Sequence, residues 1–160
     1  MHRFFISDLD LLGDEFLELR NPDLINQILK VFRGKVGDEF IFIYEEKEYL
    51  GELIELGKKS LKFKIEKLET AYRELSAKIS LYFPLLKSQE KIEFILQKCT
   101  EIGVTSFVPI ITNRTERDGL PKKQRLEKII MEAAEQSGRV VVPKLLEPVK
   151  LKSLEGGVNI

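Results

Sequence analysis

Apolar and polar residues alternate through the middle of the chain's first half. The alternation covers residues 39–68, in the runs EFIFIY, EYLGELIEL and SLKFKIEKL, with turn-like breaks between them. A period of two is typical of strands with one buried face, so the pattern predicts three antiparallel strands. In the third run we expect Leu61, Phe63 and Ile65 to point inward, while Lys62 and Lys64 form a basic outer surface.

One helix is predicted ahead of these strands. Asn21 is a plausible N-cap, Pro22 suits the first helical position, and Asp23 favours the positive end of the helix dipole. We expect the helix to continue to about Arg33 and to end at Gly34. Its apolar face would consist of Leu24, Ile25, Ile28, Leu29 and Phe32. Shorter apolar runs that are compatible with strands occur at residues 3–6 and 16–20. Strands around one helix suggest a small barrel.

The pattern changes near residue 77 to strands that alternate with helices. The order is KISLYFPLL, the helix SQEKIEFILQKCTEIG, the strand TSFVPII, the helix PKKQRLEKIIMEAAEQSG, and then RVVVP. Crossover helices allow neighbouring strands to be parallel, so we expect an α/β layer. The charged segment 66–76 is the expected linker. The predicted domains are therefore residues 1–72 and 73–160.

Both helices of the second domain have recognisable ends. Ser88 is expected to cap the first, which Gly103 would end, and the second would begin near Pro121 and end at Gly138. The residues expected to face the sheet are Ile92, Ile95, Leu96, Cys99 and Ile102 in the first helix, and Leu126, Ile129, Ile130, Ala133 and Ala134 in the second.

Charge and composition narrow the classes of function. The 26 basic and 26 acidic residues cancel, so any surface that binds nucleic acid must be a local patch. Cys99, the single cysteine, is interpreted as a core residue, and no Cys/His cluster has the spacing of a zinc site. No metal is expected. The N-terminus has no apolar signal region and no run is long enough to span a membrane, so we expect a cytoplasmic protein.

Three segments, in order, resemble the RsmE-type enzymes that methylate N3 of a uridine in small-subunit (16S) ribosomal RNA. They are INQILKVFRGKVGDEF, EKIEFILQKCTEIGVTSFVPIITNRTER and RLEKIIMEAAEQSGRVVVP. The resemblance implies a PUA-like β-barrel for RNA binding, followed by an α/β SPOUT methyltransferase domain with a trefoil knot. It also implies S-adenosylmethionine as methyl donor, ribosomal RNA or the small ribosomal subunit as partner, and a homodimer.

One departure from the family affects the cofactor. Family members continue with a Gly-Pro-Glu-Gly-Gly turn and a Leu-Arg-x-Glu-Thr-Ala-like segment, which make the knot and hold the donor. Neither motif occurs in this sequence, and Glu155-Gly156-Gly157 is only a superficial echo of the first. We therefore expect a domain that is incomplete at its C-terminus, assign no cofactor-binding residue, and expect weak binding of S-adenosylmethionine.

Methyl transfer to uridine N3 needs removal of an imide proton and stabilisation of the resulting negative charge. In the functional interpretation, Arg114 and Arg139 contact the RNA phosphate or the uracil oxygens, while Glu135 or Gln136 orients the base. If helical geometry continues to residue 139, Glu132, Gln136 and Arg139 share one helix face. The alternative interpretation is that Glu135 and Arg139 form a solvated ion pair and Arg114 is a loop charge. Gln97 and Lys98 could approach the active site, or could face solvent.

Candidate RNA contacts are Arg3, Lys30, Arg33 and Lys35, followed by Lys62 and Lys64. A solvated surface is the alternative for scattered lysines, but the resemblance places Lys30 and Arg33 in the family's basic helix. His2 is interpreted as incidental. The leading hypothesis is an rRNA methyltransferase. The alternatives are a non-catalytic RNA-binding module, and an interaction domain in which the α/β half only dimerises.

Overall fold

A computed structural model describes residues 1–7, 11–12, 15–68, 74–115 and 119–154 of the protein. The chain divides into two compact units, residues 1–73 and 74–160. The predicted domain boundary, between residues 72 and 73, lies outside the described residues, as does Glu155-Gly156-Gly157. Each unit contains its own hydrophobic core.

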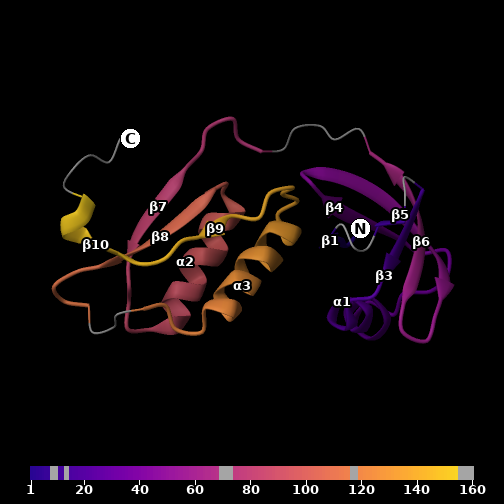
Figure 1. The fold of residues 1–160 in the computed structure, drawn as a ribbon, viewed down its shortest axis with the longest axis horizontal. Helices are drawn as coiled ribbons and strands as arrows, with labels where there is room; N and C mark the ends of the chain where they lie inside the picture. The colour runs from indigo at the N-terminus through magenta and orange to yellow at the C-terminus, as the bar shows by residue number, and fades with distance from the viewer. Residues whose placement is uncertain (8–10, 13–14, 69–73, 116–118, 155–160) are drawn as a thin grey trace. The chain divides into compact units, whose positions relative to one another are not determined.

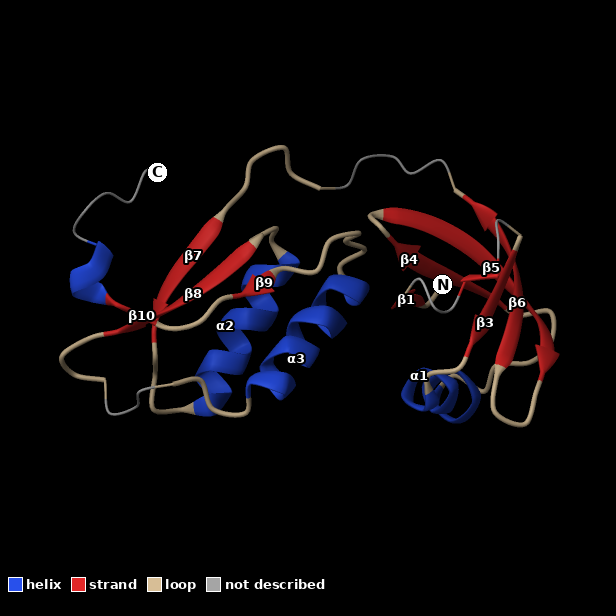
Figure 2. Cartoon of the chain, in the orientation of Figure 1, coloured by secondary structure: helices blue, strands red, loops and turns tan. Residues whose placement is uncertain are grey.

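The first unit is built on a six-stranded sheet (Figures 1 and 2). In spatial order the strands are β1 (Arg3–Phe5), β4 (Glu39–Tyr44), β5 (Lys47–Leu56), β6 (Leu61–Lys67), β3 (Phe16–Leu19) and β2 (Leu11–Leu12). The predicted antiparallel pairing of β4, β5 and β6 is confirmed, and β1 pairs with β4 in parallel. No pairing of β1 with β2 closes the sheet among the residues described.

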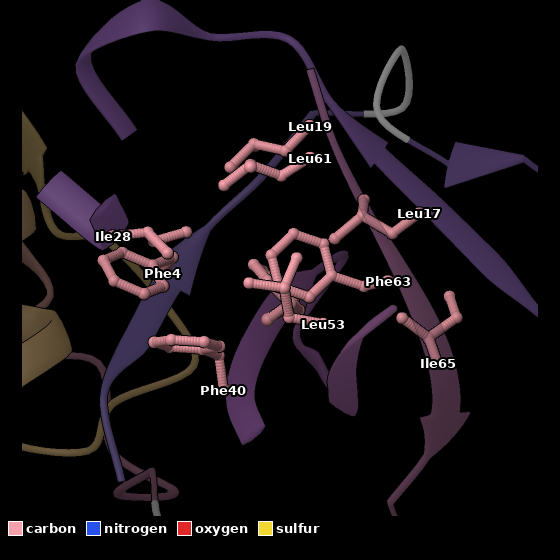
Figure 3. Packing of buried hydrophobic residues seen from close by; sticks show 10 residues of the cluster. Phe4, Leu17, Leu19, Ile28, Phe40, Leu53, Leu61, Phe63 and Ile65 are labelled. Carbon is pink, nitrogen blue, oxygen red and sulfur yellow. The ribbon is translucent and has the colours of Figure 1, made fainter. Parts of the chain in front are cut away.

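The core of this unit lies on one face of the sheet, where aromatic rings pack against aliphatic side chains (Figure 3). As predicted, Leu61, Phe63 and Ile65 are buried. The rings of Phe42 and Phe63 meet edge to face, with their centroids 4.7 Å apart. A Cβ at Gly51 would lie 2.5 Å from Cε2 of Phe42, so this glycine within β5 leaves room for that ring.

The predicted first helix is present with a different end. Asn21 caps it, accepting hydrogen bonds from the backbone N–H groups of Asp23 and Leu24. The α-helical part, α1 (Pro22–Asn26), continues as a π-helical turn, η2 (Gln27–Val31). The helix ends at Val31, before the predicted end at Gly34, and Arg33 follows it in a left-handed conformation with φ of 55°. Gly34 serves close packing instead, since a Cβ there would lie 2.9 Å from Cγ2 of Ile28.

The second unit has the predicted parallel α/β layer. Its elements are β7 (Ser80–Pro84), α2 (Gln89–Glu101), β8 (Ser106–Ile111), α3 (Lys123–Gln136), β9 (Lys144–Leu145), β10 (Val149–Lys150) and the short 3₁₀ helix η3 (Leu151–Leu154). β8 pairs in parallel with β7, β9 and β10. Side chains from both helices and from these strands share one core, so α2 and α3 cover the same face of the sheet (Figure 2).

The predicted helix ends of this unit are confirmed, but one predicted core residue is exposed. Ser88 caps α2 through the backbone N–H of Lys91. Gly103 and Gly138 follow the two helices in left-handed conformations, with φ of 102° and 75°. Ile102, expected in the core, is 73% exposed because it is the cap residue of α2 and the chain turns there.

Of the residues that the structure describes, none belongs to a helix with both the length and the apolar character needed to cross a membrane.

Candidate functional site

A hydroxyl-braced turn follows β8, at the carboxyl end of the parallel strands. The backbone N–H of Thr112 donates to Oγ1 of Thr115 at 2.8 Å, and the N–H of Arg114 donates to Oγ1 of Thr112 at 3.3 Å. Asn113 and Arg114 are both exposed on this turn. Because the carboxyl ends of parallel strands are the usual ligand-binding edge of such sheets, Arg114 is well placed to bind an anionic group.

The other predicted catalytic residues lie around the end of α3. Glu135 is buried, whereas Gln136, the last helical residue, is exposed. Gly138 then reverses the chain, and the N–H of Arg139 returns to the carbonyl of Ala134 at 2.9 Å. The expectation that Arg139 shares a helix face with Glu132 and Gln136 is therefore wrong, because helical geometry stops before residue 139.

Arg139 is held inside the second unit, with only 5% of its surface exposed. Its Nη1 donates to the carbonyls of Thr100 and Val104, at 3.1 and 2.6 Å. Its Nε and Nη2 donate to the carboxylate of Glu74. The ion pair proposed for Glu135 and Arg139 is thus replaced by one between Arg139 and Glu74.

Glu74 completes a compact cluster that we call the Glu74 clasp, formed by Glu74, Arg139 and the backbone N–H groups of Val140 and Val141. Those two N–H groups donate to Oε1 of Glu74 at 3.1 and 3.3 Å. Burial alone would raise the pKa of Glu74, but the hydrogen bonds and charge of Arg139, with the two backbone donors, lower it overall. The clasp connects Glu74, which lies within the predicted linker, to the ends of α2 and α3.

The structure does not bring Arg114 and Arg139 together. Arg114 follows the carboxyl end of β8, while the guanidinium of Arg139 binds the carbonyl of Val104, just before the strand begins. The six residues of β8 span about 20 Å at the usual rise of a strand. Contact of Arg114 and Arg139 with the RNA phosphate or the uracil oxygens remains a prediction, and the geometry within this chain does not place both arginines at one base.

One of the residues predicted to contact RNA in the first unit, Arg3, is buried in an ion pair. Its side chain, 9% exposed, forms an ion pair with the buried carboxylate of Glu48. Glu48 lies on β5 and Arg3 on β1, with β4 between them. A buried cation that is already paired is poorly placed to neutralise a phosphate, so we withdraw Arg3 from the candidate interface.

Lys30, Arg33 and Lys35 are exposed, as an RNA-binding role requires. They follow one another along the last turn of η2 and the loop beyond it. The loop is fixed by Asp38, whose carboxylate accepts from the backbone N–H of Lys35 at 2.8 Å. The backbone N–H of Asp38, in turn, donates to the carbonyl of Lys35 at 3.0 Å. Lys30, Arg33 and Lys35 together are called the basic loop below.

Lys62 and Lys64 point outward as predicted, but their surroundings are acidic. On the two neighbouring strands, Glu18 and Glu55 are paired in register with Lys62, and Glu52 with Lys64. The ammonium group of Lys62 also lies 5.0 Å from the ring centroid of Phe16. Opposite charges across strands compensate one another, so this surface is a weaker phosphate site than the basic loop.

Two further predictions concern α2. Lys98 is exposed and its ammonium group binds Glu101 at 2.9 Å, while Gln97 is also exposed, which agrees with the solvent-facing alternative. Cys99 packs against the core, and burial raises the pKa of its thiol, as expected for a structural cysteine.

An open pocket of about 350 Å³ lies on the outer side of α2, lined by Leu86, Glu90, Lys91, Phe94 and Ile95.

Sequence reasoning missed three groups. Glu74 and Glu48 were not singled out, although each pairs with an arginine that was. His2, considered incidental, stacks on Phe32 with ring centroids 3.6 Å apart and planes inclined by 29°.

Across the parts of the chain that are described, no three His, Cys, Asp or Glu side chains are placed to hold a metal ion.

Two family models match the chain. One is described as an RNA methyltransferase domain and matches residues 73–156. The other is described as an RNA methyltransferase PUA domain and matches residues 23–66. The two matches fall on the α/β unit and on the unit with the antiparallel strands, respectively.

Relatives with curated names belong to the same kind of protein as these family models. The chain is 31% identical over 158 residues to the ribosomal RNA small subunit methyltransferase E of Mesomycoplasma hyopneumoniae, covering 96% of this chain and 65% of that protein. It is 33% identical over 130 residues to the protein of the same name from Aquifex aeolicus, covering 78% and 56%.

A crystal structure of the Neisseria gonorrhoeae ribosomal RNA small subunit methyltransferase E, bound to S-adenosyl methionine, aligns with a TM-score of 0.83 at 27% identity. The alignment covers 99% of this chain and 66% of that one. The chain therefore spans less than two thirds of the length of each of these relatives.

Proposed function

This chain belongs to the RNA methyltransferase family, and on that basis we propose that it serves in the S-adenosylmethionine-dependent methylation of uridine N3 in 16S ribosomal RNA. The observation that carries the proposal is the match of residues 73–156 to the RNA methyltransferase domain, within a unit that has the parallel α/β layer. The alignment with a relative that was crystallised with S-adenosyl methionine supports the same chemistry.

We assign RNA docking to residues 1–72 and methyl transfer to the domain that begins at residue 73. The match of residues 23–66 to the PUA domain supports the first assignment. The second domain would be of the SPOUT type, with a trefoil knot. An rRNA substrate would place the protein in the cytoplasm.

For the reaction itself, Arg114 is the exposed cation at the carboxyl edge of the sheet, where it would stabilise negative charge on the uracil or on a phosphate. Gln136, exposed at the end of α3, would orient the base. We propose that Arg139 acts as a positioning residue, because its donors are bound to Glu74 and to the carbonyls of Thr100 in α2 and Val104 before β8.

The methyl donor of this family carries ribose hydroxyls, an ammonium group and a carboxylate, and each needs a polar partner when it is buried. The pocket on α2 offers only Glu90 and Lys91 beside three apolar side chains, and it is open to solvent. These residues do not fit the donor. We therefore assign no described residue to S-adenosylmethionine.

The family resemblance also implies a homodimer, and the outer side of α2 is the surface that supports this proposal. Phe94 is 62% exposed there, beside Leu86 and Ile95, which line the same pocket. An exposed group of apolar side chains often marks an interface. Light scattering after size-exclusion chromatography should show a dimer for the wild-type chain and a monomer for Phe94→Glu.

Disruption of the gene that encodes this chain tests the proposed reaction. Nucleosides from the 16S rRNA of disrupted cells should lack N3-methyluridine, and a plasmid copy of the gene should restore it. If the nucleoside persists after disruption, the methyltransferase proposal is wrong. The exposed basic loop and the PUA match would then favour the second candidate, a non-catalytic RNA-binding module with a dimerising α/β half.

A further inference from the structure

We propose that His2, supported by Phe32, is a stacking platform for one unpaired base of the bound RNA. The proposal rests on the proposed function in so far as the ligand is RNA, but it names a binding residue that the family match does not supply. The observation behind it is the stacking of the two rings, whose centroids are 3.6 Å apart and whose planes are inclined by 29°.

The platform is anchored from both sides. The carbonyl of His2 accepts a hydrogen bond from the backbone N–H of Ile41 at 2.9 Å, which continues the pairing of β1 with β4 to the second residue of the chain. Phe32 packs against the core and meets the ring of buried Phe4 edge to face, at 6.0 Å between centroids. Little conformational entropy should therefore be lost when a base binds.

Exposure and charge around the platform suit RNA. His2 is exposed although one side of its ring lies on Phe32, and the next residue after Phe32 is Arg33 of the basic loop. Arg33 keeps a left-handed conformation, with φ of 55°, that a glycine or an asparagine would adopt at lower cost. A strained, exposed arginine that directly follows Phe32 in the chain is consistent with a binding role.

The chemistry of recognition follows from these groups. Unpaired RNA bases stack on histidine and phenylalanine rings with little sequence preference, while adjacent cations neutralise the phosphates. Double-stranded RNA offers no free base face, so the platform favours single-stranded segments, loops or bulges. His2 and Phe32 would bind the base, and Arg33 with Lys35 the backbone on either side of it.

Binding of fluorescein-labelled oligouridylate to the full chain, measured by fluorescence anisotropy, tests the platform. His2→Leu keeps the apolar volume over Phe32 but removes the aromatic face, and should weaken binding roughly tenfold, within the usual range for one stacked base. His2→Phe should bind like wild type. Wild type and His2→Leu should bind inorganic polyphosphate, which has no bases, with equal affinity. Arg33→Ala should bind both oligouridylate and polyphosphate more weakly than wild type.

Thermal unfolding of each variant controls for loss of structure. Equal affinity of His2→Leu and wild type for oligouridylate overturns the platform alone, as does an equal loss of polyphosphate binding. Failure of the wild-type chain to bind oligouridylate overturns both the platform and the RNA-binding part of the proposed function. If N3-methyluridine survives gene disruption while His2→Leu still loses affinity, the catalytic proposal fails and the platform stands.

Discussion

Nη2 of Arg139 lies 2.8 Å from Oε2 of Glu74, so the residue that follows α3 is bound to a carboxylate 65 residues earlier in the chain. The same guanidinium binds carbonyls at the end of α2 and before β8. One arginine therefore holds together three segments of the second unit. Its burial explains why it serves the fold in this chain, whereas exposed Arg114 is free to face a ligand.

Replacement of Arg139 by Met should destabilise the second unit by roughly 2 to 4 kcal/mol, because it removes the cationic partner of the Glu74 carboxylate and the hydrogen bonds that Arg139 donates to two buried carbonyls. Urea unfolding measures the loss, and hydrogen exchange at the end of α2 should locate it. Arg114→Met, a matched change at an exposed arginine, should shift the unfolding free energy by less than about 0.5 kcal/mol. Similar losses for both variants would refute the role of the clasp.

Acid should weaken the contact between α2 and α3. Glu93 accepts from Arg125 Nε at 2.7 Å and from Gln89, and these hydrogen bonds lower its pKa from 4.5 to about 2. A carboxylate with a depressed folded-state pKa stabilises the fold above its unfolded value, and this contribution is lost as the pH falls from about 4.5 to 2.

The unfolding free energy of wild type should therefore fall more steeply over that pH interval than that of Glu93→Gln. Urea titrations at several pH values measure both slopes. Glu132→Gln is the control, since the carboxylate of Glu132 is exposed and lies 3.9 Å from the ammonium of Lys128. Parallel curves for wild type and Glu93→Gln would show that this ion pair does not respond to pH.

The hairpin between β4 and β5 should become more stable when its two turn residues are replaced by ones that suit their backbone conformation. Glu45 and Glu46 have φ of 47° and 61°, the conformation of a type I′ turn that favours asparagine followed by glycine. The double variant E45N/E46G should raise the unfolding free energy by about 0.5 to 1 kcal/mol. E45A/E46A removes the same charges but keeps both Cβ atoms, so it should give no such gain. Equal effects would assign the gain to charge.

RNA affinity should depend on the basic loop and not on the outer lysines of β6. The double variant K30E/R33E should weaken binding to single-stranded rRNA fragments and reduce the salt dependence, by a slope of roughly one for each phosphate that is no longer neutralised. K62E/K64E is the matched control, because glutamates on the neighbouring strands already compensate those lysines. A larger loss for the control would move the interface to the β6 surface.

Isothermal titration should detect weak binding or none when S-adenosylmethionine is added to this chain. The described pocket supplies too few polar partners for the donor. The Neisseria gonorrhoeae relative, which was crystallised with S-adenosyl methionine, is the positive control. Tight, saturable binding by this chain would show that a donor site exists which the described residues do not reveal.

The sequence pattern correctly predicted features that depend only on neighbouring residues, namely strand alternation and helix ends. Alternation was sufficient for the inward positions of Leu61, Phe63 and Ile65, because a strand's side chains have a fixed period of two. Ser88 and Gly138 were recognisable because capping and left-handed conformations favour these residue types at helix ends.

Tertiary pairing was beyond sequence reasoning. Arg3 was expected at an RNA surface but pairs with Glu48, 45 residues away, and Arg139 pairs with Glu74. Spacing along a helix or strand says nothing about partners that come from other elements. The stacking of His2 on Phe32 has the same origin, since the residue before β1 and the residue after η2 meet only in the folded unit.

We propose that this chain takes part in the methylation of a uridine of 16S rRNA, and the nucleoside content of that RNA tests this proposal directly. In cells whose gene is disrupted, mass spectrometry should find N3-methyluridine absent, restored by the wild-type gene and reduced by the gene with Arg114→Ala. Unchanged N3-methyluridine in the disrupted cells would contradict the account.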